Sequence, residues 1–108
     1  MTTVGEAGAA GDLPGLLARA QGAGPADRIE WRDRIAAFGA PAITAITPWL
    51  VDPQLAAFAI RVIERVGRDG EREAAVVVLR GARRRVDPRV RPDLDWALLQ
   101  LRAPRRSP

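Results

Sequence analysis

The chain has 108 residues and a formal net charge of +4, and it contains no His, Cys, Lys or Tyr; its only serine is Ser107. No side chain therefore titrates naturally near neutral pH, no nucleophile–base pair of the usual kind can be assembled, and no zinc site with nitrogen or sulfur ligands can form. We expect no catalytic residues, no metal and no cofactor. All 17 basic residues are arginines, but this net charge is not by itself evidence for nucleic-acid binding.

Length and hydropathy also limit the organisation and the location of the chain. The N-terminus lacks a charged stretch followed by an apolar run, and no apolar run approaches the ~18 residues that span a bilayer. We therefore expect a cytoplasmic protein that does not contact a membrane. Residues 1–11 are mainly Gly, Ala and Thr and are expected to be disordered. Residues 12–102 are expected to form a single domain, and residues 103–108 a basic C-terminal tail.

Capping residues and apolar stripes predict two helices in the first part of this domain. Asp12 and Pro14 start a short helix over residues 12–20. Pro25 starts a second helix over residues 25–38, because proline is favoured in the first helical turn. The apolar stripe of this second helix is formed by Trp31, Ile35 and Phe38.

A shorter helix is predicted over residues 41–51. Its inward side chains are Ile43, Ile46, Trp49 and Leu50. Pro48 lies inside this helix, where it removes a backbone donor and crowds the preceding turn, so we expect a kink or an early stop there. We expect Trp49 to be buried where this helix meets the next one, with a structural role.

Asp52 and Pro53 mark the start of a longer helix over residues 53–66. Asp is a good N-cap because its carboxylate accepts hydrogen bonds from the free N–H groups of the first turn, and Pro at the first helical position has no N–H to leave unpaired. The inward face carries Leu55, Ala59, Val62 and Val66, flanked by Phe58 and Ile63. The opposite face carries Arg61, Glu64 and Arg65, and the helix is expected to end in a left-handed residue at Gly67.

The ends of two predicted helices are alike, since Ile35-x-x-Phe38-Gly39 recurs as Ile63-x-x-Val66-Gly67. Between them lie residues 39–43, Trp49, Leu50, Asp52, Leu55 and Ala59. This pattern over residues 31–67 resembles the HEAT-like helical repeat family, most nearly its shorter bacterial forms, although Ala56 stands where the family often has Arg. The resemblance implies an all-α helical-repeat domain of five or six helices in about three antiparallel hairpins, stacked as a right-handed solenoid.

The last part of the domain contains two further helices. Residues 71–83 are expected to be helical, although residues 76–79 could instead form a short buried strand. We favour a helix because no partner strand is predicted elsewhere. Two prolines then make a stiff loop, and the final helix covers residues 92–102. Its apolar stripe is formed by Leu94, Leu98 and Leu101, with Trp96 and Leu99 beside it.

Charged residues form three groups that could carry a function. Asp27, Glu30 and Asp33 could contact magnesium or calcium, but their interleaving with arginines favours a solvated face. A first basic group recurs at spacings of four, three and four and consists of Arg61, Arg65, Arg68 and Arg72. A second, denser group is interrupted only by Asp87 and consists of Arg80, Arg83, Arg84, Arg85, Arg89 and Arg91. Each basic group is either a solvated, partly neutralised face or a surface for phosphates, which the planar guanidinium binds well.

Trp96 lies off the leucine stripe of the last helix, so it is the best candidate for an exposed aromatic that could stack on a base, but packing against a neighbouring helix is the favoured interpretation. The candidate binding residues are therefore Arg61, Arg65, Arg80, Arg83, Arg84, Arg85, Arg89, Arg91 and Trp96. The favoured hypothesis is a non-catalytic interaction module or small scaffold that binds another protein or a second copy of itself as a homodimer. The alternative is sequence-independent binding of a DNA or RNA backbone through residues 80–91.

Overall fold

The structure of the protein is a computed structural model that describes residues 4–102. Within this range the chain forms six α-helices and two short 3₁₀ helices and no strand, so the predicted all-α class is confirmed and the strand alternative is wrong. The elements are α1 (Val4–Gly22), α2 (Pro25–Ala36), α3 (Ala40–Ile46), η1 (Thr47–Val51), α4 (Ala56–Arg68), α5 (Arg72–Ala82), η2 (Pro88–Val90) and α6 (Arg91–Arg102).

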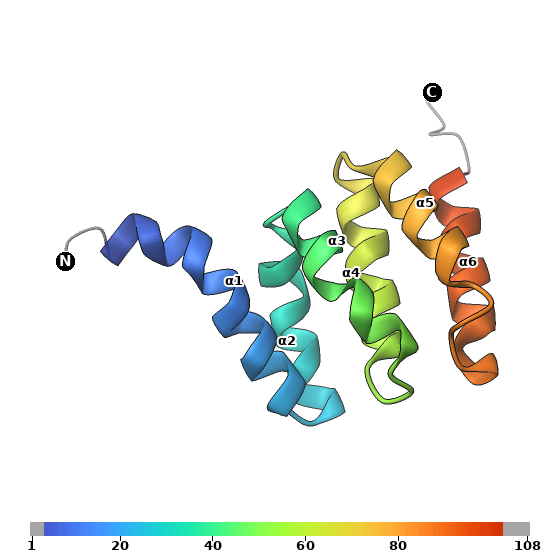
Figure 1. The fold of residues 1–108 in the computed structure, drawn as a ribbon, viewed down its shortest axis with the longest axis horizontal. Coiled ribbons are helices and arrows are strands. Elements are labelled where there is room, and N and C mark those ends of the chain that lie inside the picture. The colour runs from blue at the N-terminus through green and yellow to red at the C-terminus, as the bar shows by residue number, and fades with distance from the viewer. Residues whose placement is uncertain (1–3, 103–108) are drawn as a thin grey trace.

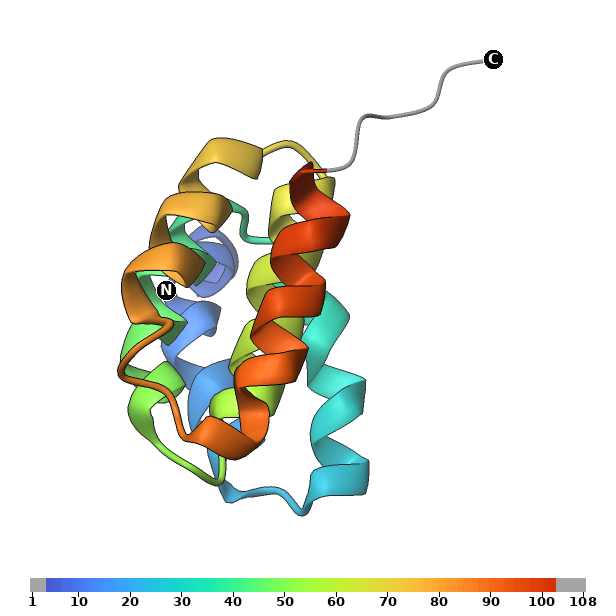
Figure 2. The ribbon, with the colours of Figure 1, turned by 90° about the vertical axis from the view of Figure 1, so that its right-hand side faces the viewer.

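The helices lie in two layers (Figures 1 and 2). Helices α1, α3 and α5 form one layer, and α2, α4 and α6 form the other. Each odd-numbered helix packs against the even-numbered helix that follows it and runs in the opposite direction. Helix α4 is central, since it contacts α2, α3, η1, α5 and α6. The even-numbered layer therefore forms one continuous face of three roughly parallel helices.

Helix α1 begins earlier than predicted. It starts at Val4, so residues 4–11 are helical where the sequence suggested disorder. Ala7, Ala9 and Ala10 have the highest helix propensity, and the helix accommodates Pro14 in its interior. Figure 1 shows the N-terminal part of α1 extending beyond the other helices. The remaining parts of the predicted termini, residues 1–3 and 103–108, lie outside the described residues.

Arg28 fastens the end of α1 to α2. Its Nε donates to the carbonyl oxygen of Ala20 at 2.7 Å, and its Nη2 donates to the carbonyl oxygen of Ala23 at 2.5 Å. Carbonyl oxygens at a helix C-terminus have no partner within the helix. The guanidinium of Arg28 supplies the missing hydrogen bonds. This contact holds the first two helices as a pair.

The predicted breaks around α3 are confirmed. Gly39, with a φ of 72°, separates α2 from α3, a backbone conformation that glycine adopts without strain. Helix α3 stops at Ile46 and the chain tightens into the 3₁₀ helix η1, which contains Pro48. The early stop expected from Pro48 is therefore present, and Thr47 marks the transition by donating its hydroxyl to the Ile43 carbonyl at 2.6 Å.

The start of α4 differs from the prediction. The helix begins at Ala56 and not at Pro53, because residues 53–55 form a turn first. The Asp52 carboxylate still accepts the N–H of Gln54 at 2.9 Å, and its main-chain oxygen accepts the N–H of Ala56 at 2.8 Å. Asp52 thus caps the turn that leads into α4, and not the first turn of the helix itself as predicted.

Gly67 has a different role from the predicted one. Helix α4 continues through it to Arg68, and the left-handed glycine is Gly70, with a φ of 144°. A Cβ at Gly67 would lie 2.7 Å from Leu101 Cδ2 and 2.8 Å from Ala75 Cβ. The missing side chain therefore lets α5 and α6 approach α4 closely, which is a packing requirement that no local pattern reveals.

The predicted apolar stripes form the core, except for some of their aromatic residues. Fully buried side chains include Ile35, Ile46, Leu50, Ile60, Val62, Ile63, Val66, Leu79 and Leu94. Trp31 and Trp49 are only half-buried, although both were expected inside. Trp49 does lie at the predicted junction, with its ring centroid 6.0 Å from that of Phe58 on α4. Its indole packs against the edge of the core there.

No helix in the described part of the chain is long and apolar enough to cross a membrane.

Candidate functional site

A small pocket opens on the even-numbered layer, where α2, α4 and α6 meet. It has a volume of about 110 Å³ and is lined by Arg32, Arg61, Glu64, Arg65, Arg68 and Trp96. We call it the Trp96 pocket. Its wall residues come from three different helices, so the even-numbered layer has to be assembled before the pocket exists. An adjoining smaller cavity adds Asp93 of α6 to the same surroundings.

The arginines of α4 line this pocket because of their spacing. Arg61, Arg65 and Arg68 follow one another at intervals of four and three and so lie on one face of the helix. Part of the predicted basic ridge is therefore present. Arg72 is not part of it, since the chain turns at Gly70 and places Arg72 at the start of α5, against a different groove.

The guanidinium groups of the Trp96 pocket differ in how far they are already paired. Arg65 bonds Asp33 through Nη1 and Asp69 through Nε, each at 3.0 Å. Arg68 Nε lies 3.4 Å from the Glu64 carboxylate. Arg61 makes no hydrogen bond or ion pair with any described residue. Arg61 is thus the cation of this pocket that remains available to a ligand.

Glu64 departs from the prediction that it lies exposed with Arg61. Only 5% of its surface is exposed, because α6 packs beside it and places Trp96 and Asp93 over the same cavities. Burial of a carboxylate without a partner is costly, and the nearby Arg68 offsets that cost. Sequence periodicity alone assigned Glu64 to solvent, since it could not include the neighbouring helix.

Trp96, the best candidate in the sequence for an exposed aromatic, is exposed, although packing against a neighbouring helix was the favoured interpretation. Just over half of its surface, 52%, is open to solvent, and Leu99 one turn later on α6 is 59% exposed. Pro92, Trp96 and Leu99 follow one another at spacings of four and three and lie on one side of the helix, which makes an exposed apolar stripe. An aromatic side chain beside available arginine is the composition that is enriched at the energetic centres of protein interfaces.

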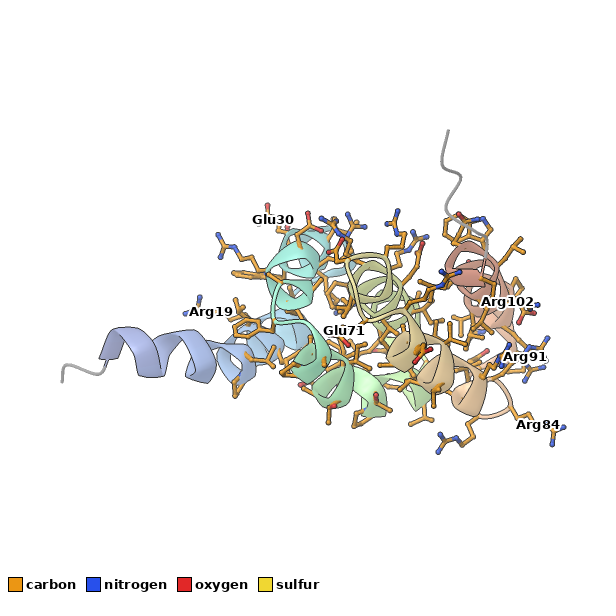
Figure 3. All side chains as sticks on the ribbon, turned by 90° about the horizontal axis from the view of Figure 1, so that it is seen from above. Arg19, Glu30, Glu71, Arg84, Arg91 and Arg102 are labelled. Atoms are coloured by element: carbon orange, nitrogen blue, oxygen red, sulfur yellow. The ribbon has the colours of Figure 1, made fainter. Side chains whose placement is uncertain are left out.

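The second basic group, residues 80–91, lies at the end of the molecule formed by α5 and α6, the helix pair that also carries Trp96, but none of its members lines the Trp96 pocket. Figure 3 shows Arg84 and Arg91 pointing away from the helices at this end. Arg80, Arg84 and Arg85 are exposed and have no ion pair or hydrogen bond with described residues. The group is therefore not brought together with Arg61 and Trp96 into one site.

Three members of the second basic group are already engaged. Arg83 holds Asp95 of α6 through two hydrogen bonds of 2.6 and 2.8 Å, Arg89 holds Asp87, and Arg91 donates to the carbonyl oxygen of Arg83. The hydrogen bond from Arg83 lowers the pKa of Asp95, and the hydrogen bonds from Arg89 lower the pKa of Asp87. Asp95 was not counted as a neutralising partner, because nothing in the sequence places it next to Arg83.

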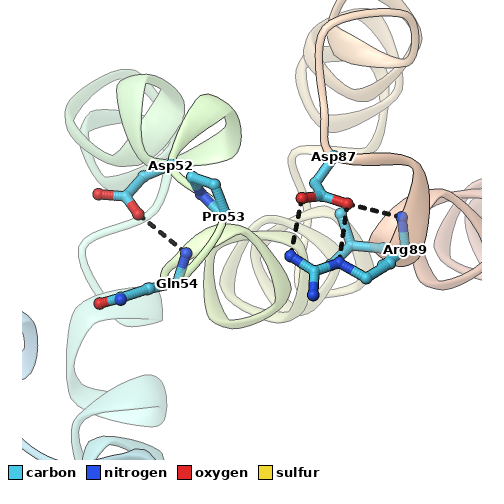
Figure 4. A pocket seen from close by; sticks show the side chains of 6 residues that line it. Asp52, Pro53, Gln54, Asp87 and Arg89 are labelled. Atoms are coloured by element: carbon cyan, nitrogen blue, oxygen red, sulfur yellow. Dashed lines mark hydrogen bonds and ion pairs between the residues drawn. The ribbon is translucent and has the colours of Figure 1, made fainter.

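A wide, open depression lies between the loop that precedes α4 and the loop that precedes α6 (Figure 4). It is lined by Asp52, Pro53, Gln54, Asp87, Arg89 and Val90. Its polar groups bond to one another, since Asp52 accepts from the N–H of Gln54 and the Asp87 carboxylate accepts from Arg89. These hydrogen bonds satisfy the Asp52 and Asp87 carboxylates and the Arg89 guanidinium, and they support the two loops.

Trp31 and Asp33 of α2 are also engaged in contacts within the protein. The guanidinium carbons of Arg19 and Arg34 lie 5.9 and 5.2 Å from the centre of the Trp31 ring, the geometry of cation–π contacts. Asp33, one of the three candidate metal ligands, is bonded by Arg65. Among residues 4–102, no group of three or more carboxylates could hold a metal ion.

No family model, no curated protein and no solved structure matches this chain. No residue role can therefore be transferred from a relative. The HEAT-like resemblance rests on the residues between positions 31 and 67 alone, and the functional argument rests on the Trp96 pocket and on the basic residues described above.

Proposed function

We propose that the protein is a HEAT-like helical-repeat module without catalytic activity that binds another protein in the cytoplasm. In this proposal the three helix pairs are successive units of a short right-handed solenoid, and the face of α2, α4 and α6 is the binding surface. The two-layered stacking of consecutive pairs supports the solenoid.

The observation that carries the proposal is that two available side chains line one pocket built from three helices. They are the exposed indole of Trp96 and the guanidinium of Arg61, which has no partner among the described residues. An exposed indole loses contact with water when a partner covers it, and a guanidinium can then donate several hydrogen bonds to the same partner. The surrounding ion pairs hold the side chains of Arg65 and Asp33 in place, so the surface is partly ordered before binding.

Affinity capture with matched variants tests this proposal. Tagged wild type, Trp96→Ala and Arg84→Ala are incubated with lysate from a cell that contains the native protein, and the captured proteins are identified by mass spectrometry. We expect a partner that wild type and Arg84→Ala retain and that Trp96→Ala loses. Arg84 is the control because it is exposed and unpaired but does not line the Trp96 pocket. Equal capture by all three proteins would contradict binding through this face.

Self-association is the second form that the same proposal can take, because a second copy could cover Trp96 as well as another protein could. Light scattering on purified protein over a range of concentrations distinguishes the two. A mass that doubles with concentration in wild type but not in Trp96→Ala indicates a homodimer through this face. A constant monomer mass assigns the face to a different protein.

Nucleic-acid binding through residues 80–91 is the second candidate function. The observation that favours it is the exposure of Arg80, Arg84 and Arg85 without any carboxylate partner in the described chain. Such a site would bind the phosphate backbone without reading sequence, and its affinity would fall steeply with salt as counterions are released.

A titration of labelled duplex and single-stranded DNA at low and moderate salt tests this candidate. We expect Arg84→Ala combined with Arg85→Ala to weaken binding, whereas Arg61→Ala should leave it unchanged. If no DNA binds even at low salt, the candidate is excluded. If the Arg61 variant loses as much affinity as the double variant, the site lies elsewhere.

A further inference from the structure

The outer side of the last helix pair carries an apolar groove that is separate from the Trp96 pocket. The groove lies between α5 and α6, has a volume of about 490 Å³ and is lined by Arg72, Glu73, Val76, Val77, Leu101 and Arg102. Val77 is 69% exposed, more than the other exposed large apolar side chains of the described residues, which are Ile29, Val51, Trp96 and Leu99. Helices α5 and α6 pack against α3 and α4 on one side, and no described element covers the other side.

The rim of this groove is positively charged. Arg80 follows Val76 and Val77 by one helical turn on the same side of α5, and it makes no ion pair or hydrogen bond with any described residue. Arg72 and Arg102 line the groove itself, and Glu73 is the one carboxylate among the lining residues. Asp95, the nearest further carboxylate on α6, is held by Arg83.

This charge determines which kind of molecule fits the groove. A second copy that stacked on the same surface would bring one basic rim against another, and like charges across an interface disfavour association. A partner with carboxylates beside apolar side chains would bury the valines and pair with Arg80 at the same time. The groove between two helices is also the shape that receives a third helix, with apolar side chains at spacings of three and four directed into it.

We propose that the α5–α6 groove binds an amphipathic helix of a partner protein, whose apolar face covers exposed Val77 and half-buried Val76 and whose acidic side chains pair with Arg80. This proposal does not depend on the Trp96 pocket, because the two surfaces share no residue. A chain that bound one partner through both surfaces would hold it more tightly than either surface alone.

Synthetic peptides of about 14 residues, or four helical turns, provide the probe. The first peptide has leucines at spacings of three and four and glutamates elsewhere. The second has lysine in place of each glutamate, and the third keeps the glutamates but has serine in place of each leucine. Fluorescence anisotropy of the labelled peptides at moderate salt gives the affinity, and amide chemical shifts in the protein map the site. We expect only the first peptide to bind, with shifts centred on Val76, Val77 and Leu101.

Three variants locate the contact. Val77→Ser and Arg80→Glu should each weaken binding of the first peptide by about tenfold or more, the size of effect that a central interface residue produces. Arg61→Glu is the matched control, since it reverses one exposed, unpaired arginine on another surface and changes the net charge equally. It should leave the affinity within about twofold. Val77 and Arg80 are exposed, so both variants should keep the wild-type fold, which circular dichroism verifies.

Several results would overturn the proposal. Equal losses in Arg80→Glu and Arg61→Glu would reduce the effect to overall charge, and binding of the serine peptide would mean that the apolar groove is not used. Tight binding of the lysine peptide would refute the charge argument. Self-association that Val77→Ser abolishes would assign the groove to a second copy. Trp96→Ala separates the two proposals, because it should bind the first peptide normally even if it loses the partner of the Trp96 pocket.

Discussion

Helices α4 and α6 have similar apolar stripes but different surroundings. In α4, nine of 13 residues are buried, including the charged Glu64, because five other elements contact it. In α6, only three of 12 residues are buried, and Trp96 and Leu99 remain exposed. The difference follows from position in the stack, since α6 has neighbours on one side only within the described chain. The centre of the fold thus provides stability, whereas the last helix pair provides surface that a partner can cover.

Truncation in the two helices should give the largest contrast. Ile63 of α4 is fully buried, so Ile63→Ala should lower the free energy of unfolding by about 2–5 kcal/mol through lost burial and the cavity that remains. Leu99→Ala in α6 removes a side chain of similar size from an exposed position and should change stability by less than about 0.5 kcal/mol. Urea denaturation measures both. Similar losses at the two positions would mean that α6 is covered in solution.

Trp49 is intermediate between the fully buried Ile63 and the exposed Leu99. It lies at the junction of η1 and α4 but is only half-buried, so Trp49→Ala should cost about 2 kcal/mol, below the ~3–5 kcal/mol of a fully buried tryptophan. Phe58 should lose packing when the indole is removed. A thermal melt equal to that of wild type would show that Trp49 contributes nothing to the core and would favour a role in binding.

Substitutions at two glycines test the close approach of α4 to the last helix pair. Gly67→Ala places a methyl group against Leu101 and Ala75, and because Ala75 Cβ is attached directly to the backbone of α5, the helices have to separate. We expect a loss of about 1–3 kcal/mol. Gly81→Ala in α5 meets open space and should stabilise the helix by up to about 1 kcal/mol. If both changes stabilise the protein, α5 and α6 pack less closely on α4 than described here.

The sequence predicted local features well because each depends on residues close together in the chain. The early stop at Pro48, the break at Gly39 and the stripe of α4 all follow from spacing and backbone chemistry. Two of its errors concern features that depend on distant residues. Gly67 is a contact point for Leu101, and Glu64 is buried by α6, neither of which a single helix can reveal.

The candidate site shows the same division. Trp96 was identified as the best candidate for an exposed aromatic because it lies off the stripe of its own helix, and the Arg61–Arg65 ridge followed from helical spacing. The Trp96 pocket itself was not predicted, since its walls come from three helices. The basic segment was overestimated for the same reason, because Asp95 pairs with Arg83 from a different helix.

The smallest expected effect concerns this Arg83–Asp95 pair and its dependence on pH. The pKa of Asp95 is lowered in the folded protein by the hydrogen bond from Arg83, so the ionised carboxylate favours the folded state. This contribution is present at neutral pH and is lost as the pH falls below the ordinary aspartate value of 3.8 and through the lower folded value. Wild type should therefore be slightly more stable than Asp95→Asn at pH 7, and the two stabilities should converge in acid. Because the pair is exposed, the difference should be small and should shrink with added salt.

Arg83→Ala should behave like Asp95→Asn, whereas Arg84→Ala, which removes a neighbouring unpaired arginine, should keep the wild-type pH dependence. Thermal melts from pH 7 to pH 2 measure this, and a constant gap between wild type and Asp95→Asn across that range would show that the asparagine acts through something other than the lost charge.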